Sequence, residues 1–368
     1  MRLYLHLVSN KVWGGGEQYV FDLCKHLQSE GQQVEVYCRP FEDVVSPFRS
    51  LSVPVHVVAL KGVLDISTAR KLAKRIQHES EVLIHVHNFK DAFTAAYARW
   101  LSGNSHVAIV VTRHLVKPAK CSLLYRWLYR QIDHVVFVSH LAKDTFLNSH
   151  PPIDESRLSV VHNSLVLPNE VSSSHIREHL NIGRDQVVGM YHGRLAEEKG
   201  IFVLMEAMSL LRDLNFELFV AGTGSQQVQA RLQAIITEKS LGQHVHLLGF
   251  VKNIPSVICD ADFGIIPSVA RESFSLAGIE YMSQGRCVIA TNHGGQVEYI
   301  EEGVTGLLVP PNDADALAAA IRRLVVDRNL CQQMGEQGQR KFLTQMNYTH
   351  FFEQIKKVYS DCMNGRSS

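Results

Sequence analysis

The stretch that decides the fold is residues 187–212, which read VVGMYHGRLAEEKGIFVLMEAMSLLR. Its first six residues, 187–192, form an apolar run that predicts a buried strand, and residues 202–212 predict a helix. A short charged loop joins the two. A buried strand that leads through such a loop into a helix is the repeating unit of a parallel sheet covered by helices on both faces.

The same alternation extends in both directions from this stretch. In the second half of the chain we expect further strands and helices, the strands at 216–221, 245–248, 263–266, 287–290 and 306–309 and the helices at 225–239, 275–283 and 313–327. In the first half we expect strands at 3–9, 33–38, 53–58, 82–87, 107–112 and 134–138, with helices at 18–29, 68–78 and 91–101. The pattern therefore predicts an α/β fold built from two Rossmann-like halves.

The rhythm breaks near residue 163, where the polar stretch LPNEVSSS (167–174) is typical of a linker. The length of 368 residues also favours two domains, at roughly 150 residues per domain. We therefore expect a first domain of 1–168 plus 347–368, a linker of 169–182 and a second domain of 183–346. A final helical pattern at 348–359 is expected to cross back to the first domain.

The composition excludes some function classes. Hydrophobic residues make up 46% and charged residues 20% of the chain, and a net charge of +1 argues against a nucleic-acid binder, which needs a marked basic excess. The charge is uneven, because residues 1–165 carry 19 Lys and Arg against 14 Asp and Glu. Residues 92–132 contain no acid and interleave arginines and lysines with Trp100, Tyr125, Trp127 and Tyr129. Such a segment suits an anionic membrane surface, and it equally suits helices whose aromatics face the core.

The cysteines and the apolar runs indicate a compartment. Seven cysteines are scattered singly without C-x-x-C spacing, which is typical of reduced thiols in the cytosol. No run of 18 apolar residues occurs, and the first residues lack the pattern of a signal peptide. We expect a cytoplasmic protein, attached at most to the inner face of a membrane.

Three motifs can carry chemistry. The first is Gly14-Gly15-Gly16-Glu17, where glycines after the first strand let a phosphate or sugar approach the backbone. The motif is not G-x-G-x-x-G and no acid ends the second strand, which counts against a dinucleotide cofactor. A tight turn without a ligand explains the glycines as well.

The second motif is HGRLAEEKG (192–200), in which Arg194 and Lys199 can clamp a diphosphate without a metal. The third is residues 267–280, where seven residues separate Glu272 from Glu280 at the start of a helix. Two carboxylates at this separation suit the two ends of a nucleotide sugar, with the backbone N–H groups of 273–276 available for phosphates. Taken singly, each motif is also explained by solvated charges and a helix cap.

The motifs together resemble a known family. The E-x7-E pair is preceded by G-R-L-x-x-E-K-G and followed by TNHGGQVE (291–298), and other pieces occur in the family's order: 14–16, 221–224 (AGTG), 248–251 (LGFV), 261–262 (AD) and 303–309 (GVTGLLV). This set resembles the retaining glycosyltransferases of family 4, which have the GT-B fold of two Rossmann-like domains with parallel sheets facing across a cleft. The resemblance covers nearly the whole chain and is strongest over 188–325.

The resemblance implies an activity. It implies metal-independent transfer of a sugar, with retention, from a nucleotide-diphosphate sugar to a saccharide or lipid-linked acceptor. A UDP-sugar is favoured and a GDP-sugar comes next. No cofactor beyond this co-substrate is implied, and the process would be bacterial-type cell-surface polysaccharide or lipopolysaccharide assembly.

The resemblance also assigns roles to residues. Arg194 and Lys199 match the pair that neutralises the diphosphate, Glu272 matches the carboxylate on the transferred sugar, and Glu280 matches the one on the ribose. The other matching donor positions are Gly15, Gly16, Gly222, Val251, Ser273, Phe274, Ser275 and Leu276. Ser275 stands where the family more often has glycine and Cys287 where it more often has proline, while Gly278 is expected to weaken its helix.

The 19 histidines yield one main candidate. His114 follows a strand ending in Thr112-Arg113, and it matches a family histidine that reaches the donor sugar near the reacting carbon. Arg113 and His87 are candidate acceptor contacts, and the pair His85 and His87 can present one imidazole at the edge of the sheet. No H-E-x-x-H or other tight ligand cluster occurs, so no bound metal is expected.

Two other functions remain open. One is a non-catalytic nucleotide-sugar-binding subunit of a glycan assembly complex, although the four charged residues Arg194, Lys199, Glu272 and Glu280 argue against lost catalysis. The other is a second kind of GT-B enzyme. An epimerase would lack the E-x7-E arrangement, and a phosphorylase would need a pyridoxal-bearing lysine context that is not visible.

Overall fold

The computed structural model describes residues 2–168 and 171–367, and these residues form two compact units. The first unit is Met1–Ser164 together with Tyr348–Ser368, and the second is Leu165–Asn347. The expected linker of 169–182 starts at Asn169 and Glu170, which lie outside the described residues. The hydroxyls of Ser173 and Ser174, further along that stretch, donate to the carboxylate of Asp260 at 2.5 and 2.6 Å.

The first unit contains a seven-stranded sheet in the order β3-β2-β1-β4-β5-β6-β7, and all of its pairings are parallel. Its strands are β1 (Leu3–Val8), β2 (Gln33–Cys38), β3 (Val55–Val57), β4 (Val82–Val86), β5 (Val107–Arg113), β6 (His134–Phe137) and β7 (Leu158–Val160). Strand β7 was not expected from the sequence. Consecutive strand residues are buried on both faces, as parallel sheets require.

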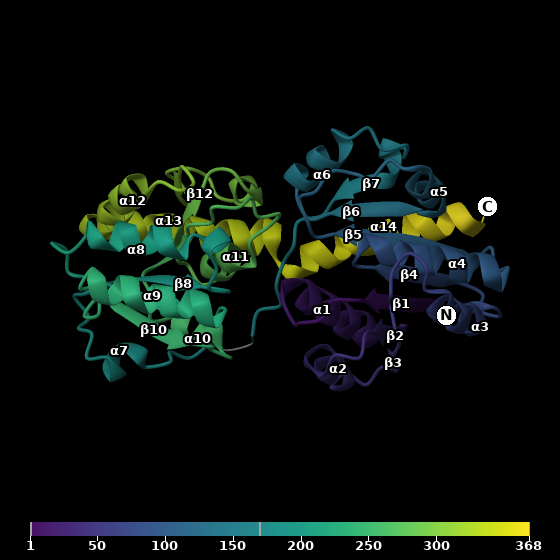
Figure 1. Cartoon of the computed structure of the whole chain (residues 1–368), viewed down its shortest axis with the longest axis horizontal. Coiled ribbons are helices and arrows are strands. Elements are labelled where there is room, and N and C mark those ends of the chain that lie inside the picture. The colour runs from purple at the N-terminus through teal and green to yellow at the C-terminus, as the bar shows by residue number, and fades with distance from the viewer. Residues whose placement is uncertain (1, 169–170, 368) are drawn as a thin grey trace. The chain divides into compact units, whose positions relative to one another are not determined.

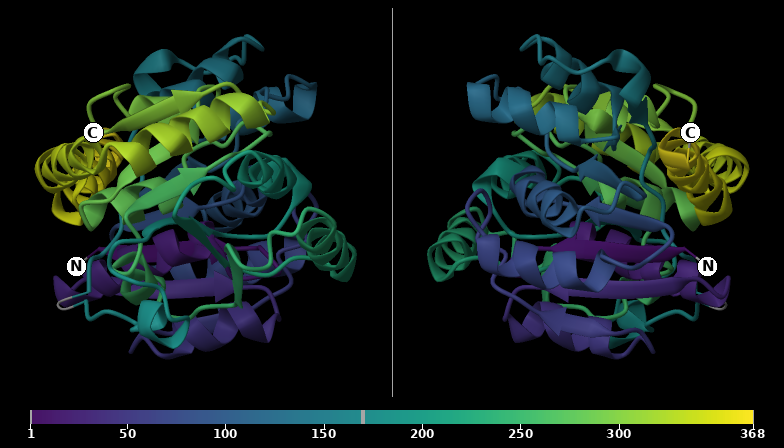
Figure 2. Two further views of the ribbon diagram at one scale, coloured as in Figure 1. Left: turned by 90° about the vertical axis from the view of Figure 1, so that its left-hand side faces the viewer. Right: turned by 90° about the vertical axis from the view of Figure 1, so that its right-hand side faces the viewer.

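Helices cover both faces of this sheet (Figure 1, Figure 2). Residues of α1 (Gly15–Ser29), α2 (Glu42–Arg49) and α14 (Tyr348–Ser367) form one core with the sheet. Residues of α3 (Ile66–Ile76), α4 (Ala92–Ser102), α5 (Leu123–Gln131) and α6 (His140–Leu147) form the core on the other face. Short 3₁₀ turns, η1 (Phe89–Asp91) and η2 (Glu155–Arg157), complete the unit. The C-terminal helix therefore packs as part of the first unit, although it follows the second in the sequence.

The second unit contains a six-stranded parallel sheet in the order β10-β9-β8-β11-β12-β13. Its strands are β8 (Val187–His192), β9 (Phe216–Ala221), β10 (Val245–Gly249), β11 (Phe263–Ile266), β12 (Cys287–Thr291) and β13 (Gly306–Val309). Its helices are α7 (Ile176–His179), α8 (Ile201–Ser209), α9 (Gln226–Glu238), α10 (Ile254–Ile258), α11 (Leu276–Ser283), α12 (Ala314–Val326) and α13 (Arg328–Lys341), with the turns η3 (Glu197–Lys199) and η4 (Gly295–Glu298) and the π-helical turn η5 (Phe342–Met346). The predicted fold class, α/β with two Rossmann-like domains, is confirmed.

Each sheet has one point where the strand order reverses. In the first unit it lies between β1 and β4, and in the second it lies between β8 and β11. Loops that leave the carboxyl ends of these neighbouring strands run in opposite directions, which opens a crevice where ligands bind in sheets of this kind. The glycine loop at 14–16 and the loops at 193–200 and 267–275 all start beside these points.

The acid-free segment 92–132 spans α4, β5 and α5. Tyr129 is buried and Trp127 stacks on Tyr97, so most of these aromatics face the core. This agrees with the interpretation of the segment as helices whose aromatic side chains face the core. Trp100 differs, because 77% of it is exposed. Across the described residues, every helix is too short or too polar to cross a membrane.

Candidate functional site

In the second unit, charged side chains meet beside the reversal point between β8 and β11. Lys199 lies in η3, after the loop that leaves β8, and its Nζ is 2.9 Å from Oε2 of Glu272. Glu272 lies in the loop that leaves β11, and its other oxygen accepts a hydrogen bond from the buried hydroxyl of Ser268. The side chain of Glu272 is only 13% exposed, so both partners hold it in one orientation.

Arg194 is placed differently from Lys199. Its guanidinium pairs with Glu198 at 2.6 Å on the surface, with 64% of the Arg194 side chain exposed. An exposed pair of this kind contributes little stability and exchanges partners easily. Arg194 is therefore available to an anionic ligand, whereas Lys199 can reach one only by sharing its charge with Glu272.

Glu280 lies on α11 and contacts the last residue of β8. His192 Nε2 is hydrogen-bonded to a carboxylate oxygen of Glu280, and His192 Nδ1 lies 2.7 Å from the hydroxyl of Tyr281. That hydroxyl donates to the carbonyl of Met190 at 2.8 Å, so it accepts from His192 Nδ1–H. The contact with His192 Nε2 fixes the position of Glu280.

Two glycines let these loops approach other backbone segments. Gly200 has φ +75°, and a Cβ there would lie 1.8 Å from the carbonyl oxygen of Pro267. Gly222 has φ +145°, and a Cβ there would lie 1.8 Å from the carbonyl oxygen of Gly193. Gly222, an expected donor contact, is thus required by the packing of the loops after β8 and β9.

Glu272 and Glu280 do not lie on one continuous helix. Glu272 lies in a loop and the helix begins at Leu276, so no helical rise relates Glu272 to Glu280. Phe274 packs on Tyr299 with ring centroids 5.0 Å apart, and Gly295 approaches the carbonyl of Ser273 so closely that a Cβ there would lie 2.0 Å away. Ser275 has φ −83°, which needs no glycine. Val251 is half-buried in the loop after β10.

Gly278 has a packing reason that the sequence does not reveal. A Cβ at this position would lie 2.1 Å from the hydroxyl oxygen of Tyr299. That hydroxyl donates to the carbonyl of Ser275 at 3.1 Å and ties the helix to the segment after β12. The expected local weakening of the helix is therefore accompanied by a close tertiary contact.

In the first unit, a cavity of about 490 Å³ lies beside the reversal point between β1 and β4. Gly16, His87, Arg113 and His114 all line it, so the structure brings together four residues that the sequence singled out. A Cβ on Gly16 would meet only an Asn10 nitrogen, 3.9 Å away, so the packing here does not require glycine. Burial lowers the pKa of His114 to about 4, and its imidazole is neutral at pH 7.

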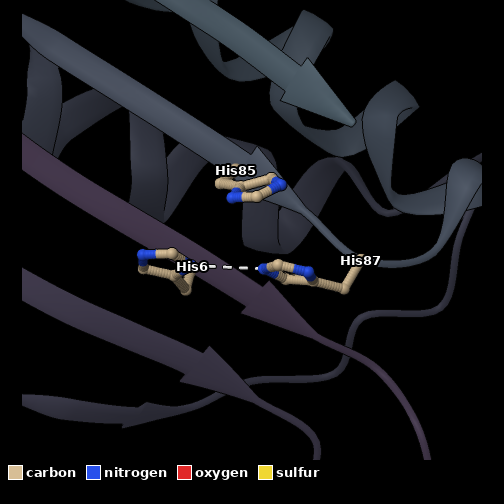
Figure 3. Close-up of side chains that lie close together, drawn as sticks. All are labelled: His6, His85 and His87. Carbon is tan, nitrogen blue, oxygen red and sulfur yellow. Dashed lines mark hydrogen bonds between the residues drawn. The ribbon is translucent and has the colours of Figure 1, made fainter. Parts of the chain in front are cut away.

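His87, which lines this cavity, lies close to two histidines of β1 and β4 (Figure 3). His6 on β1 and His85 on β4 are register partners, and His6 Nδ1 is 3.2 Å from His87 Nε2. One nitrogen from each of the three lies within 4.8 Å of the others, an arrangement that can hold a metal ion. Both nitrogens of His85 already lie 2.7 Å from hydroxyls, of Thr112 and Tyr359, so His85 would have to release one to bind a metal. The expectation of no bound metal stays a prediction.

Two family models match the chain. The model of the group 1 glycosyl transferases matches residues 172–341, and that of glycosyltransferase family 4 matches residues 13–166. The matches follow one another along the chain and coincide with its two Rossmann-like units. The chain is a glycosyltransferase of the family 4 type.

Individual relatives of this glycosyltransferase agree with the assignment. An uncharacterized glycosyltransferase of Methanocaldococcus jannaschii is 24% identical over 95% of both chains. A lipopolysaccharide 1,2-N-acetylglucosaminetransferase of Salmonella typhimurium is 29% identical over 42% of this chain and 43% of its own. The Anabaena protein HepE, solved with UDP and with UDP-glucose, is 21% identical, with a TM-score of 0.84 over 98% of this chain and 100% of its own in the UDP complex. The last similarity shows that the fold is GT-B.

The expected site residues of the glycosyltransferase fall into two groups, one in each unit. Arg194, Lys199, Glu272 and Glu280 belong to the second unit, and Gly16, His87, Arg113 and His114 belong to the first. Sequence reasoning missed three contacts: Ser268 on Glu272, His192 on Glu280, and His6 on His87. His192 stands directly before the G-R-L motif, which was the one available signal. His85, taken with His87 as a candidate for the sheet edge, is fully buried.

Proposed function

We propose that this glycosyltransferase moves a sugar from a nucleotide-diphosphate sugar to a saccharide or lipid-linked acceptor, with retention and without a metal. The observation that carries the proposal is the group of Lys199, Glu272 and Ser268 at the reversal point of the second sheet. A cation beside a fixed carboxylate suits the two parts of a sugar diphosphate, because the ammonium attracts the phosphates and the carboxylate accepts hydrogen bonds from sugar hydroxyls.

The roles of the residues follow from their chemistry. Arg194 and Lys199 neutralise the charge that develops on the departing diphosphate, which is the work that a metal does in other transferases. Glu272 holds hydroxyls of the transferred sugar. Glu280, held by His192, accepts hydrogen bonds from the ribose hydroxyls. The N–H groups of residues 273–276 at the start of α11 face the phosphates. The second unit thus binds the donor.

The acceptor hydroxyl attacks from the face on which the diphosphate leaves. The new glycosidic C–O bond forms as the C–O bond to the phosphate breaks, and the leaving phosphate takes the proton of the hydroxyl. In this scheme no carboxylate forms a covalent intermediate, in contrast to a retaining glycosidase. The cavity of the first unit binds the acceptor, and the neutral imidazole of His114 hydrogen-bonds the sugar near the reacting carbon.

The relatives favour one donor and one process. HepE has been solved with UDP and UDP-glucose, which supports a UDP-sugar ahead of a GDP-sugar. A lipopolysaccharide N-acetylglucosaminetransferase among the relatives supports a role in cell-surface polysaccharide or lipopolysaccharide assembly, carried out in the cytoplasm at the inner face of the membrane. The remaining candidate is a subunit that binds nucleotide sugars without turning them over.

Replacement of Glu272 tests the proposal. Glu272→Gln keeps the size of the side chain and removes its charge, so we expect hydrolysis and transfer from UDP-glucose to fall by about a hundredfold. Glu301→Gln is the matched control, because Glu301 pairs with Lys341 at the surface of the same unit. Nuclear magnetic resonance of the product should show the anomeric configuration of the donor. Wild-type turnover in Glu272→Gln would exclude the proposed role, and no turnover of any UDP- or GDP-sugar by the wild type would favour the binding subunit.

A further inference from the structure

The cavity of the first unit is lined by cations without anions. Arg113, Lys117 and Lys120 all line it, and no aspartate or glutamate does. None of the three forms an ion pair within residues 2–168 and 171–367. A cavity that gathers three positive charges and excludes negative ones has a strong preference for an anionic ligand.

Arg113 differs from the two lysines, because its guanidinium is half-buried. Its Nη2 donates to the carbonyls of Lys117 and Pro118, and its carbon lies 5.5 Å from the ring of Phe89 and 5.1 Å from that of Phe146. Its Nε is buried and has no hydrogen-bond partner. Burial lowers the pKa of Arg113, and no carboxylate is among the groups that oppose this shift.

Other guanidinium groups of the same unit show the contrast. Arg99 is buried against the carboxylate of Asp133 at 3.0 Å, and Arg75 lies 2.7 Å from Glu35. At these two positions the fold supplies a carboxylate, which offsets the cost of withdrawing the charge from water. At Arg113 the carboxylate is missing and a cavity takes its place.

The rest of the cavity suits a sugar. The rings of Phe89, Tyr125 and Tyr129 form part of its wall, and aromatic faces pack on the C–H faces of sugar rings. Two half-buried imidazoles, those of His87 and His114, also line it and offer hydrogen bonds to hydroxyls. Aromatic rings, neutral imidazoles and three cations in one cavity match a saccharide that carries a phosphate.

We propose that the acceptor is a phosphate-bearing saccharide, and that Arg113, Lys117 and Lys120 bind its phosphate in the cavity of the first unit. Nη2 of Arg113 already donates to two carbonyls, so Nε–H and Nη1 are the guanidinium donors left for phosphate oxygens, and the two lysines balance the second negative charge. The proposal rests on the proposed function, since it names the class of acceptor. The two cations assigned to the donor diphosphate, Arg194 and Lys199, belong to the second unit. Gly16, a matching donor position, lines the cavity of the first unit, so separate KM values for donor and acceptor decide which anion its three cations bind.

Binding measurements on the full chain test this assignment. Glucose 6-phosphate is the soluble probe, glucose is its uncharged control, and vesicles of phosphatidic acid in phosphatidylcholine present the same group on a lipid. All three tryptophans, Trp13, Trp100 and Trp127, belong to the first unit, so their fluorescence reports binding there. We expect glucose 6-phosphate or the phosphatidic acid vesicles to bind about tenfold more tightly than glucose or pure phosphatidylcholine. Binding of the soluble probe indicates a soluble acceptor, and binding of the vesicles alone indicates a lipid-linked one.

Variants separate the assignment from a general charge effect. Arg113→Gln and the double variant Lys117→Gln/Lys120→Gln should each weaken phosphate binding about tenfold. The lysines are exposed, so their replacement leaves the fold intact even if Arg113→Gln does not. Arg126→Gln, an exposed arginine of α5 outside the cavity lining, should bind as the wild type does.

Three results would overturn the assignment. The first is equal binding of the phosphorylated and the uncharged probes, and the second is wild-type binding by both variants. The third is a raised KM for the nucleotide sugar in the variants with an unchanged KM for the acceptor, since the cations would then serve the donor. UDP binding and turnover, measured alongside, distinguish a failure of this assignment from a failure of the proposed function.

Discussion

Replacement of His6 by glutamine should change how the stability of the first unit depends on pH. His6 is fully buried, and burial lowers its pKa from 6.5 to about 3. Below pH 6.5, His6 therefore binds a proton in the unfolded chain but not in the folded chain. The contribution of a neutral His6 to stability is present above pH 6.5 and is lost as the pH falls toward 3.

The magnitude follows from the linkage between protonation and folding. Between pH 7.5 and pH 5.5, one histidine that titrates only in the unfolded chain lowers the free energy of unfolding by about 1.4 kcal/mol. His85 is also fully buried, with a pKa well below 6.5 for the same reason, so the pair together lowers it by about 3 kcal/mol. Asp22 and Asp91 act in the opposite direction, because burial raises their pKa to about 6 and about 7. The effect of His6 alone is thus measured by the difference in the free energy of unfolding between the wild type and His6→Gln.

Urea unfolding of the full chain, followed by tryptophan fluorescence, measures this difference. All three tryptophans belong to the first unit, so the signal reports that unit. We expect the stability of the wild type relative to His6→Gln to fall by about 1.4 kcal/mol between pH 7.5 and pH 5.5. His78→Gln, at an exposed position, is the control and should show no such change. A difference that is independent of pH would refute the reasoning, because His6 would then titrate alike in both states.

Three further predictions concern the second unit. Gly278→Ala should lower the free energy of unfolding, followed by circular dichroism, by about 2 kcal/mol, because its Cβ would lie 2.1 Å from the Tyr299 hydroxyl. Gly242→Ala is the control, since the space around Gly242 is open. A Gly278→Ala variant more stable than the wild type would contradict this prediction. His192→Gln should raise the KM for the nucleotide sugar several-fold with little change in kcat, since Glu280 loses its partner. The same variant should reduce the preference for UDP over its 2′-deoxy analogue. An unchanged preference would show that Glu280 does not bind the ribose. Among UDP, GDP, ADP and CMP, UDP should raise the melting temperature most, and a larger shift with GDP would reassign the donor.

The fold could be predicted from the sequence because its signals are local. Each buried strand is a short apolar run, and the helix that follows begins after a glycine or charged loop, as at residues 187–212. Strand β7 (Leu158–Val160) was not predicted, because it has only three residues, whereas the equally short β3 at the other edge lies within the longer apolar run 53–58. The extent of α14, to Ser367, also exceeded the apolar pattern that ends at Tyr359.

The candidate site could be predicted only in part, because its contacts are not local. Glu272 and Lys199 were found through motifs, yet their ion pair joins loops that follow different strands. The pairing of His6 with His87 depends on the strand order that places β1 beside β4, which no spacing in the sequence states. The acid-free stretch 92–132 indicated an excess of cations in this part of the chain. Only the fold shows that Arg113 has no carboxylate partner while Arg99 has one.

The initial rate of UDP release from UDP-glucose in the presence of EDTA measures whether transfer proceeds without a metal and depends on Lys199. The proposed metal-independent transfer predicts that the wild type keeps its full rate, that Lys199→Met loses about a hundredfold, and that the control Lys341→Met, which removes an ion pair with Glu301 in the same unit, is unchanged. A wild-type rate abolished by EDTA and restored by a divalent cation, or a Lys199→Met variant as fast as the wild type, would contradict it.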